Sequence, residues 1–88
     1  MYSVMALEFP NQSRSYDNKG KRVRFTGYDG MFEVMFFARA DALSNPADGE
    51  EPYLAAFDAA RETIYDAARR IYLKGRKAVY VLTASDVT

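Results

Sequence analysis

The sequence contains no cysteine and no histidine among its 88 residues. The lack of cysteine excludes disulfide bonds and thiolate chemistry. The lack of histidine removes the usual general base, the commonest metal ligand and the histidine-activated serine and cysteine nucleophiles. Any catalysis would fall to Asp, Glu, Lys or Tyr, and we expect a protein that is not an enzyme and has no catalytic residues.

Long apolar runs and nucleotide-binding motifs are also missing. No stretch of about 18 apolar residues is present, and the N-terminus lacks the charged and apolar regions of a signal peptide. We therefore expect a cytoplasmic protein that does not bind membranes. Neither GxxxxGK[ST] nor GxGxxG occurs, so a phosphate-binding glycine loop has no support and no cofactor is expected.

The densest acidic cluster, formed by Asp48, Glu50 and Glu51, does not have the ligand spacing of a calcium-binding loop. Proline and glycine interrupt it, and we expect no metal site. Hydrophobic residues make up 49% of the chain and aromatic residues 15%, which predicts a folded domain. Residues 1–88 are long enough for one domain with a single core and little to spare.

The most regular stretch runs from Pro52 to Lys74, and its spacing predicts one long amphipathic helix. Apolar residues recur at steps of three and four, and Arg61 alone interrupts this stripe. Pro52 suits the first helical turn, and Gly75 suits a left-handed stop after the last one. Arg61 either clamps an anion or forms a structural ion pair with Asp58 or a hairpin acid, and the ion pair is favoured.

Alternation of apolar and polar residues predicts strands over 6–9, 13–16, 21–28, 31–38 and 77–83. Asp29-Gly30 predicts a two-residue type I′ hairpin turn that pairs Tyr28 with Met31. A second turn ends at Gly20 with positive φ, and a single helical turn is expected over 39–43. The sequence thus predicts an α+β fold, a small antiparallel-rich sheet of four to five strands with one long helix over 52–74 on one face.

The outward face of the predicted hairpin is rich in aromatic, Met and Arg side chains, which interface cores favour. In the predicted register Arg24 lies diagonal to Glu33, within reach of an ion pair. We interpret the protein as a non-enzymatic interaction module whose outer face docks a second copy or another protein. The candidate interface residues are Arg22, Arg24, Tyr28, Met31, Glu33, Met35 and Phe37.

Helix length gives a second reason to expect a homodimer. A helix of about 23 residues is about 34 Å long, whereas a seven-residue strand spans only about 23 Å, so the helix should overhang the sheet. The alternative remains open that the N-terminal segment and the last strand cover the outer face within one subunit.

Two clusters of basic residues and tyrosines, 14–28 and 69–77, indicate an alternative function. Such mixtures bind single-stranded nucleic acid or another polyanion, provided that the two clusters meet in space. The simpler interpretation is that they are solvated faces, with Asp66 paired to Arg70 on the helix. The candidate anion-binding or ion-pairing residues are Arg61, Arg69, Arg70, Lys74 and Arg76.

Short motifs spread over most of the chain form a recognisable set. They are Leu7–Asn11, Ser15–Asp17, Val23–Phe25, Gly27–Gly30, Glu33-Val34, Phe36-Phe37, Asp41–Leu43, Phe57-Asp58, Ala60-Arg61, Tyr80–Thr83 and Ser85-Asp86. This set, which extends from about Met5 to Asp86, resembles the domain-of-unknown-function family numbered 1488. The resemblance implies a small stand-alone bacterial protein of α+β fold. It implies no catalytic residues, because the family has none assigned.

Overall fold

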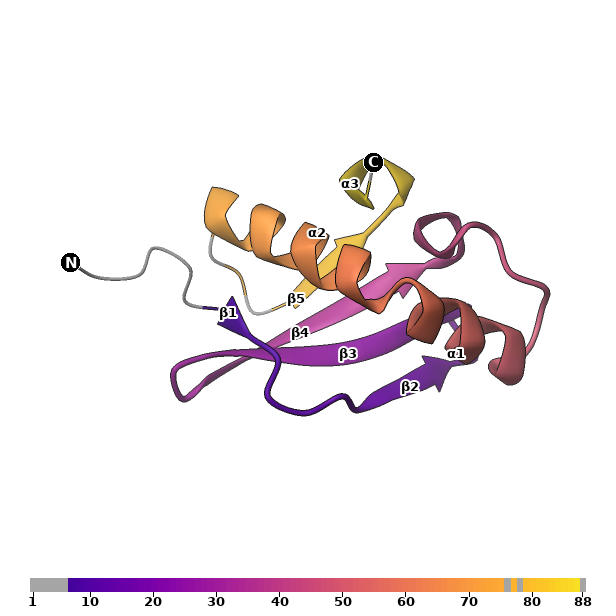
Figure 1. The fold of residues 1–88 in the computed structure, drawn as a ribbon, viewed down its shortest axis with the longest axis horizontal. Helices are drawn as coiled ribbons and strands as arrows, with labels where there is room; N and C mark the ends of the chain where they lie inside the picture. The colour runs from indigo at the N-terminus through magenta and orange to yellow at the C-terminus, as the bar shows by residue number, and fades with distance from the viewer. Residues whose placement is uncertain (1–6, 76, 78, 88) are drawn as a thin grey trace.

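The computed structural model describes residues 7–75, 77 and 79–87 (Figure 1). Its elements are β1 (Leu7–Glu8), β2 (Arg14–Asp17), β3 (Arg22–Asp29), β4 (Phe32–Arg39), the 3-10 turn η1 (Ala40–Leu43), α1 (Glu50–Ala59), α2 (Arg61–Lys74), β5 (Val79–Leu82) and α3 (Ala84–Val87). The predicted α+β class is confirmed, as is the helical turn before the long loop. Two residues named in the sequence predictions lie outside the described residues. They are Ala6, the first residue of the first predicted strand, and Arg76, a candidate anion-binding residue.

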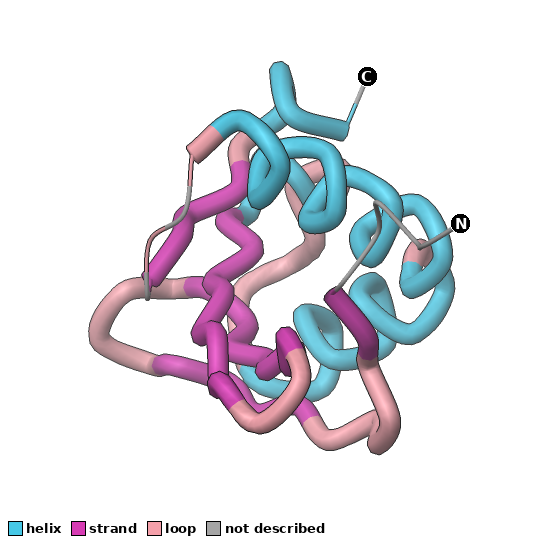
Figure 2. Tube along the Cα trace, turned by 90° about the vertical axis from the view of Figure 1, so that its left-hand side faces the viewer, coloured by secondary structure: helices cyan, strands magenta, loops and turns pink. Residues whose placement is uncertain are grey.

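The sheet is built around the β3–β4 hairpin. β1 and β2 both pair with β3 in antiparallel orientation, and β5 pairs with β4 in parallel orientation. A parallel neighbour needs a long crossover, which the segment containing α1 and α2 supplies. Figure 2 shows these helices gathered on one side of the strands.

The hairpin turn differs from the predicted one. Asp29 pairs with Phe32, so Gly30 and Met31 are the two central turn residues, and the predicted pairing of Tyr28 with Met31 is wrong. Gly30 has φ +64° and Met31 does not have positive φ. These are the signs of a type II′ turn, which requires glycine at the first central position, whereas type I′ requires positive φ at both. The error changes the pairing partners by two positions, which leaves every side chain on its predicted face.

The predicted single helix is two helices. Ala60 has φ −106° and ψ 14°, and its N–H is shared between the carbonyls of Ala56 and Phe57, each at 3.1 Å. The break turns α2 relative to α1 and lets both helices follow the sheet. Phe57 before the break and Ile64 after it are both fully buried.

The break also removes the basis of the predicted overhang. The helices contain 10 and 14 residues, which corresponds to about 15 Å and about 21 Å. The hairpin strands of eight residues each span about 26 Å. Neither helix is longer than the sheet beneath it, so the length argument for a neighbouring subunit no longer applies.

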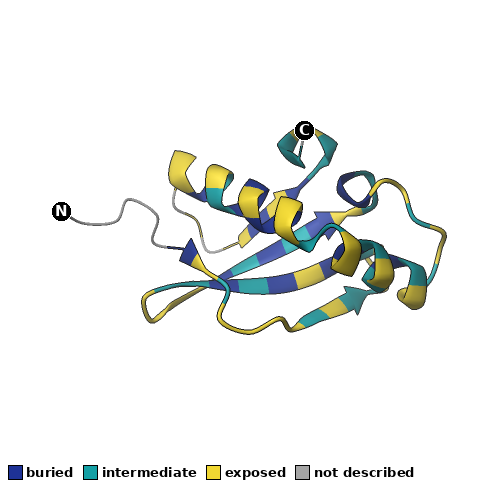
Figure 3. Ribbon diagram, in the orientation of Figure 1, coloured by how far each residue is buried: buried dark blue, intermediate teal, exposed yellow. Residues whose placement is uncertain are grey.

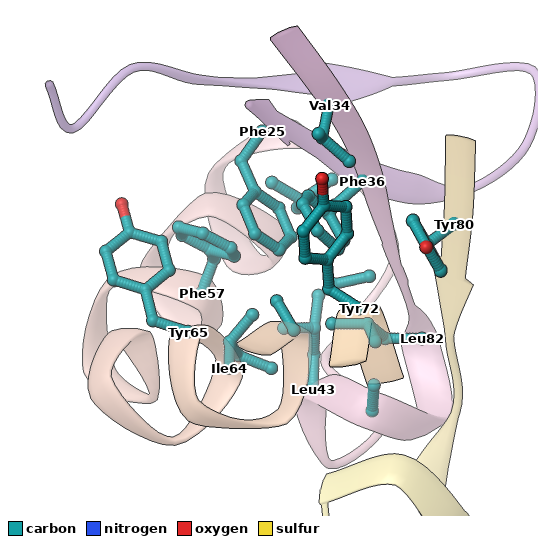
Figure 4. Close-up of a cluster of buried hydrophobic side chains, with 14 of the residues drawn as sticks. Phe25, Val34, Phe36, Leu43, Phe57, Ile64, Tyr65, Tyr72, Tyr80 and Leu82 are labelled. Carbon is teal, nitrogen blue, oxygen red and sulfur yellow. The ribbon is translucent and has the colours of Figure 1, made fainter. Parts of the chain in front are cut away.

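Aromatic rings fill the space between sheet and helices. The ring centroid of Phe25 lies 5.2 Å from that of Phe36 and 5.0 Å from that of Phe57 (Figure 4). Phe9, which follows β1, stacks on Tyr65 of α2 at 4.0 Å. Figure 3 shows the buried residues concentrated where the helices face the sheet.

Two glycines have roles other than the predicted ones. Gly20 does not take positive φ, and Lys21 does so instead, with φ 55°. Position 20 has no room for a side chain, because a Cβ there would lie 2.6 Å from Nε of Arg22. Gly75 has extended backbone, with φ −173° and ψ 134°, where a left-handed stop was predicted. Its carbonyl accepts a hydrogen bond from the hydroxyl of Tyr80, which draws the chain toward β5.

Gly27 in β3 provides a test of the packing of β1. A Cβ at this position would lie 2.8 Å from Cε1 of Phe9 and 3.0 Å from Cδ1 of Leu7. Leu7 is only 1% exposed, so it has little room to move. We expect Gly27→Ala to destabilise the protein by about 1–3 kcal/mol through overpacking, measured by urea denaturation.

Gly75→Ala is the matched control. Among the described residues other than its chain neighbours, no atom lies within 4 Å of a Cβ at Gly75, and the extended backbone at this position suits any residue. We expect this variant to be neutral or more stable by up to about 1 kcal/mol, since alanine restricts the unfolded chain. A large loss of stability in Gly75→Ala, or none in Gly27→Ala, would contradict this account of the two positions.

Candidate protein-interaction surface

The side chains of β3, β4 and β5 that point away from the helices form one continuous surface, which we call the outer sheet face. Its members follow from the strand pairing and are Arg22, Arg24, Thr26, Tyr28, Glu33, Met35, Phe37, Arg39, Val79 and Val81. It contains every predicted interface residue except Met31. Met31 lies at the hairpin tip, where its side chain is 100% exposed.

The centre of the outer sheet face is apolar. The parallel pairing of β5 places Val79 beside Met35 and Val81 beside Phe37. Val79 is 50% exposed and Val81 is 42% exposed. Alternation along the last strand correctly indicates that these valines share a side, but nothing in the sequence identifies β4 as their neighbour.

No described helix or strand covers the outer sheet face. β1 is hydrogen-bonded to β3 and β5 is hydrogen-bonded to β4, so both extend the sheet at its edges without crossing the face. The predicted alternative, in which the last strand covers this face, is therefore wrong. Any contribution of residues 1–6 lies outside the described residues.

At one end of the outer sheet face, Arg22 contacts both a carboxylate and an aromatic ring. Arg22 donates from Nε to Oδ2 of Asp17 at 2.8 Å, and its guanidinium carbon lies 3.8 Å from the ring centroid of Phe37. The bond from Arg22, with a smaller contribution from the N–H of Gly20, holds the pKa of Asp17 below its usual value. Arg24 and Phe37 line a neighbouring hollow of about 390 Å³.

The predicted ion pair between Arg24 and Glu33 is wrong. Arg24 lies opposite Phe37, whereas Glu33 lies opposite Tyr28, four residue pairs further along the hairpin. The turn geometry explains the difference, because the predicted register placed these two side chains on adjacent pairs. Their charges are therefore at opposite ends of the same face.

Arg61 forms a structural ion pair, as its position in the apolar stripe indicates. Its Nη2 donates to Oδ1 of Asp58 at 2.7 Å and its Nη1 to the Tyr65 hydroxyl at 2.8 Å. Its side chain is only 15% exposed. Arg14 of β2 donates to both oxygens of the same carboxylate, at 2.9 and 2.7 Å. Asp58 therefore joins β2 to the junction of α1 and α2.

Two of the remaining candidate cations, Arg69 and Arg70, donate hydrogen bonds to groups of the same chain. Arg69 donates to Asp66 and to the carbonyl of Leu7, each at 3.3 Å. Arg70 donates to the carbonyl of Asp86 at 2.8 Å. The predicted pairing of Asp66 with Arg70 is wrong, because Arg69 takes the carboxylate and Arg70 reaches toward α3.

The described residues of the two basic clusters lie mostly at different ends of the molecule. The cluster on β2 and the start of β3 lies at one end of the molecule, and the end of α2 lies at the other (Figure 1). Tyr72 is 2% exposed, and the ring of Tyr16 packs against Tyr53 at 5.1 Å. Lys74 and Lys77 line a hollow of about 550 Å³ beside β5. Binding of nucleic acid or another polyanion stays a prediction.

A comparison with protein families shows where the chain belongs. The model of the family described as "Protein of unknown function (DUF1488)" matches residues 7–82. The chain is a member of this family. The match confirms the resemblance drawn from the short motifs and spans all five strands with α1 and α2. Searches of curated proteins and of solved structures gave no match.

In the part of this DUF1488 chain that the structure describes, no helix is long and apolar enough to cross a membrane.

The ion pairs of Asp58 predict how stability depends on pH. Hydrogen bonds from Arg14, and to a lesser extent from Arg61, hold the pKa of Asp58 below its usual value. The carboxylate therefore stabilises the native state above the unfolded pKa of about 3.9, and this contribution is lost as the pH falls through the lowered native pKa. We expect Asp58→Asn to cost about 1–2 kcal/mol at pH 7, a modest value because the side chain is partly exposed.

Thermal unfolding between pH 2 and pH 7 measures this effect. The gap in Tm between wild type and Asp58→Asn should narrow as the pH falls below about 4. Glu62→Gln, an exposed change on α2, is the control and should follow the wild type at every pH. A gap that stays constant over the whole range would show that Asp58 acts through packing alone.

Proposed function

We propose that this protein is a non-enzymatic protein-interaction module that forms a homodimer through its outer sheet face. One observation carries the proposal. Met35, Phe37, Val79 and Val81 form a contiguous apolar centre that no described helix or strand covers. Water-exposed apolar area of this kind favours association with another apolar surface.

The architecture supports a protein partner. An antiparallel-rich sheet covered on one side by helices normally has a polar second face. Here the inner face buries Phe25 and Phe36, and the outer face is again apolar at its centre. The mixture of aromatic, Met and Arg side chains on the outer sheet face is the one found at the centres of protein interfaces.

The size of the face is consistent with a dimer of two such domains. The two hairpin strands have eight residues each, β2 and β5 have four each and β1 has two. At about 3.3 Å per residue and about 4.8 Å between strands, one face covers about 400 Å². Two such faces bury on the order of 800 Å² in total, which is the range of weak interfaces. A second copy supplies a patch of the same size and character. We expect a dimer that dissociates on dilution into the micromolar range.

The molecular mass in solution tests the proposal. We expect Phe37→Asp to convert a dimer into a folded monomer, because the new carboxylate would lose its water in the interface. Sedimentation across a dilution series measures the association, and far-ultraviolet circular dichroism reports the fold. Val79→Asp repeats the test at a side chain that is 50% exposed in one subunit, where the fold tolerates a charge more readily.

Leu73→Asp on α2 is the matched control, since Leu73 is 49% exposed but lies on the helical side of the protein. It should leave the dimer intact. A wild type that stays monomeric at the highest soluble concentration would overturn the proposal. So would a dimer that both outer-face variants leave folded and associated.

A further inference from the structure

Charges on the outer sheet face are separated by sign. Arg22, Arg24 and Arg39 lie where β3 begins and β4 ends. Glu8 and Glu33 lie at the hairpin end, on either side of Tyr28, since both pair with that residue from neighbouring strands. The apolar centre lies between the two ends.

Some of the side chains that carry this separation have an acidic partner inside the subunit, and the others have none among the described residues. Arg22 is engaged by Asp17 at 2.8 Å, and Nε of Arg39 lies 3.9 Å from Oδ1 of Asp41. Arg24, Glu8 and Glu33 are exposed, and over residues 7–75, 77 and 79–87 no acidic or basic side chain forms an ion pair with any of them. Arg24 lies four residues from Tyr28 along β3, or about 13 Å, which is too far for an ion pair with the acids around Tyr28.

Given the proposed function, the geometry points to an antiparallel dimer in which Arg24 of each copy lies over Tyr28 of the other. In this position Arg24 lies between the partner's Glu8 and the partner's Glu33. The two-fold axis lies in the interface, runs across the strands and passes at the level of the Thr26–Met35 pair. Each unpartnered arginine thereby gains a ring face and two carboxylates. Each pair of unpartnered glutamates gains a cation.

Charge excludes the other simple way to stack two sheets. A two-fold axis along the strands would place the basic end of one copy against the basic end of the next, and would do the same with the acidic ends. Like charges brought together at an interface oppose association. An axis across the strands reverses the ends, so unlike charges meet and fix the orientation.

The same axis keeps Met35 and Val79 of the apolar centre together, whereas Phe37, the cross-strand neighbour of Arg24, lies opposite Glu33 of the other copy. Thr26, Met35 and Val79 share one level of the sheet, because Met35 pairs with both of the other two. A two-fold axis at this level places each of them near its own counterpart in the second copy. The predicted interface therefore has an apolar centre with charged pairs at both ends, which is the usual anatomy of a protein interface.

Charge reversal tests the arrangement. We expect Arg24→Glu and Glu33→Arg, each alone, to weaken the homodimer about tenfold or more, since each places like charges together twice per dimer. An equimolar mixture of the two variants should form a heterodimer, because every altered side chain then meets an opposite charge. The double variant R24E/E33R should regain part of the homodimer strength, because the carboxylate at position 24 then meets a cation at position 33 but still lies near the second copy's Glu8. Sedimentation and native mass spectrometry, with one variant isotopically labelled, distinguish these species.

Lys74→Glu and Glu62→Arg, on exposed positions of α2, are the controls and should associate as the wild type does. Raising the salt concentration to about 1 M should weaken the wild type and the mixture while bringing the single variants closer to them. The inference is overturned if the single variants associate normally, or if their mixture is no stronger than either alone. These outcomes leave the proposed homodimer intact as long as Phe37→Asp and Val79→Asp still dissociate it.

Discussion

The structure depends on burying the inner face of the β3–β4 hairpin. Phe25 and Phe36 lie side by side on that face, and Phe57 and Ile64 close over them from two different helices. Every other strand attaches to one of the two hairpin strands. The bend at Ala60 follows from the same requirement, since it lets both helices reach the rings.

The sequence predicts the facing of side chains better than it predicts their partners. Alternation has a period of two, so the faces of β3 and β4 are correct even though the register is not. The register depends on whether Gly30 is the first or the second central residue of the turn, and the sequence pattern allows both. The break at Ala60 has no local signal, because alanine is the best helix former and the packing of α1 and α2 overrides its propensity.

The same distinction applies to the candidate site. The bond between Arg61 and Asp58 joins residues three apart on neighbouring turns, and such a local contact can be inferred from spacing. Arg14, which also binds the Asp58 carboxylate, lies 44 positions away in the sequence. Residue spacing therefore cannot predict this bond. The valines of β5 join the outer sheet face because a crossover returns the chain parallel to β4, which is a property of topology rather than of any short pattern.

The hairpin therefore specifies two surfaces with one alternating pattern. Its odd positions in β3 and even positions in β4 build the core, and the positions between them build the outer sheet face. A chain of this length buries only part of its apolar surface in a single two-layer core. In the homodimer that we propose, a second copy would supply a third and a fourth layer without lengthening the chain. Because the two sets of side chains alternate, substitutions on the outer sheet face would alter the proposed association with little effect on the core.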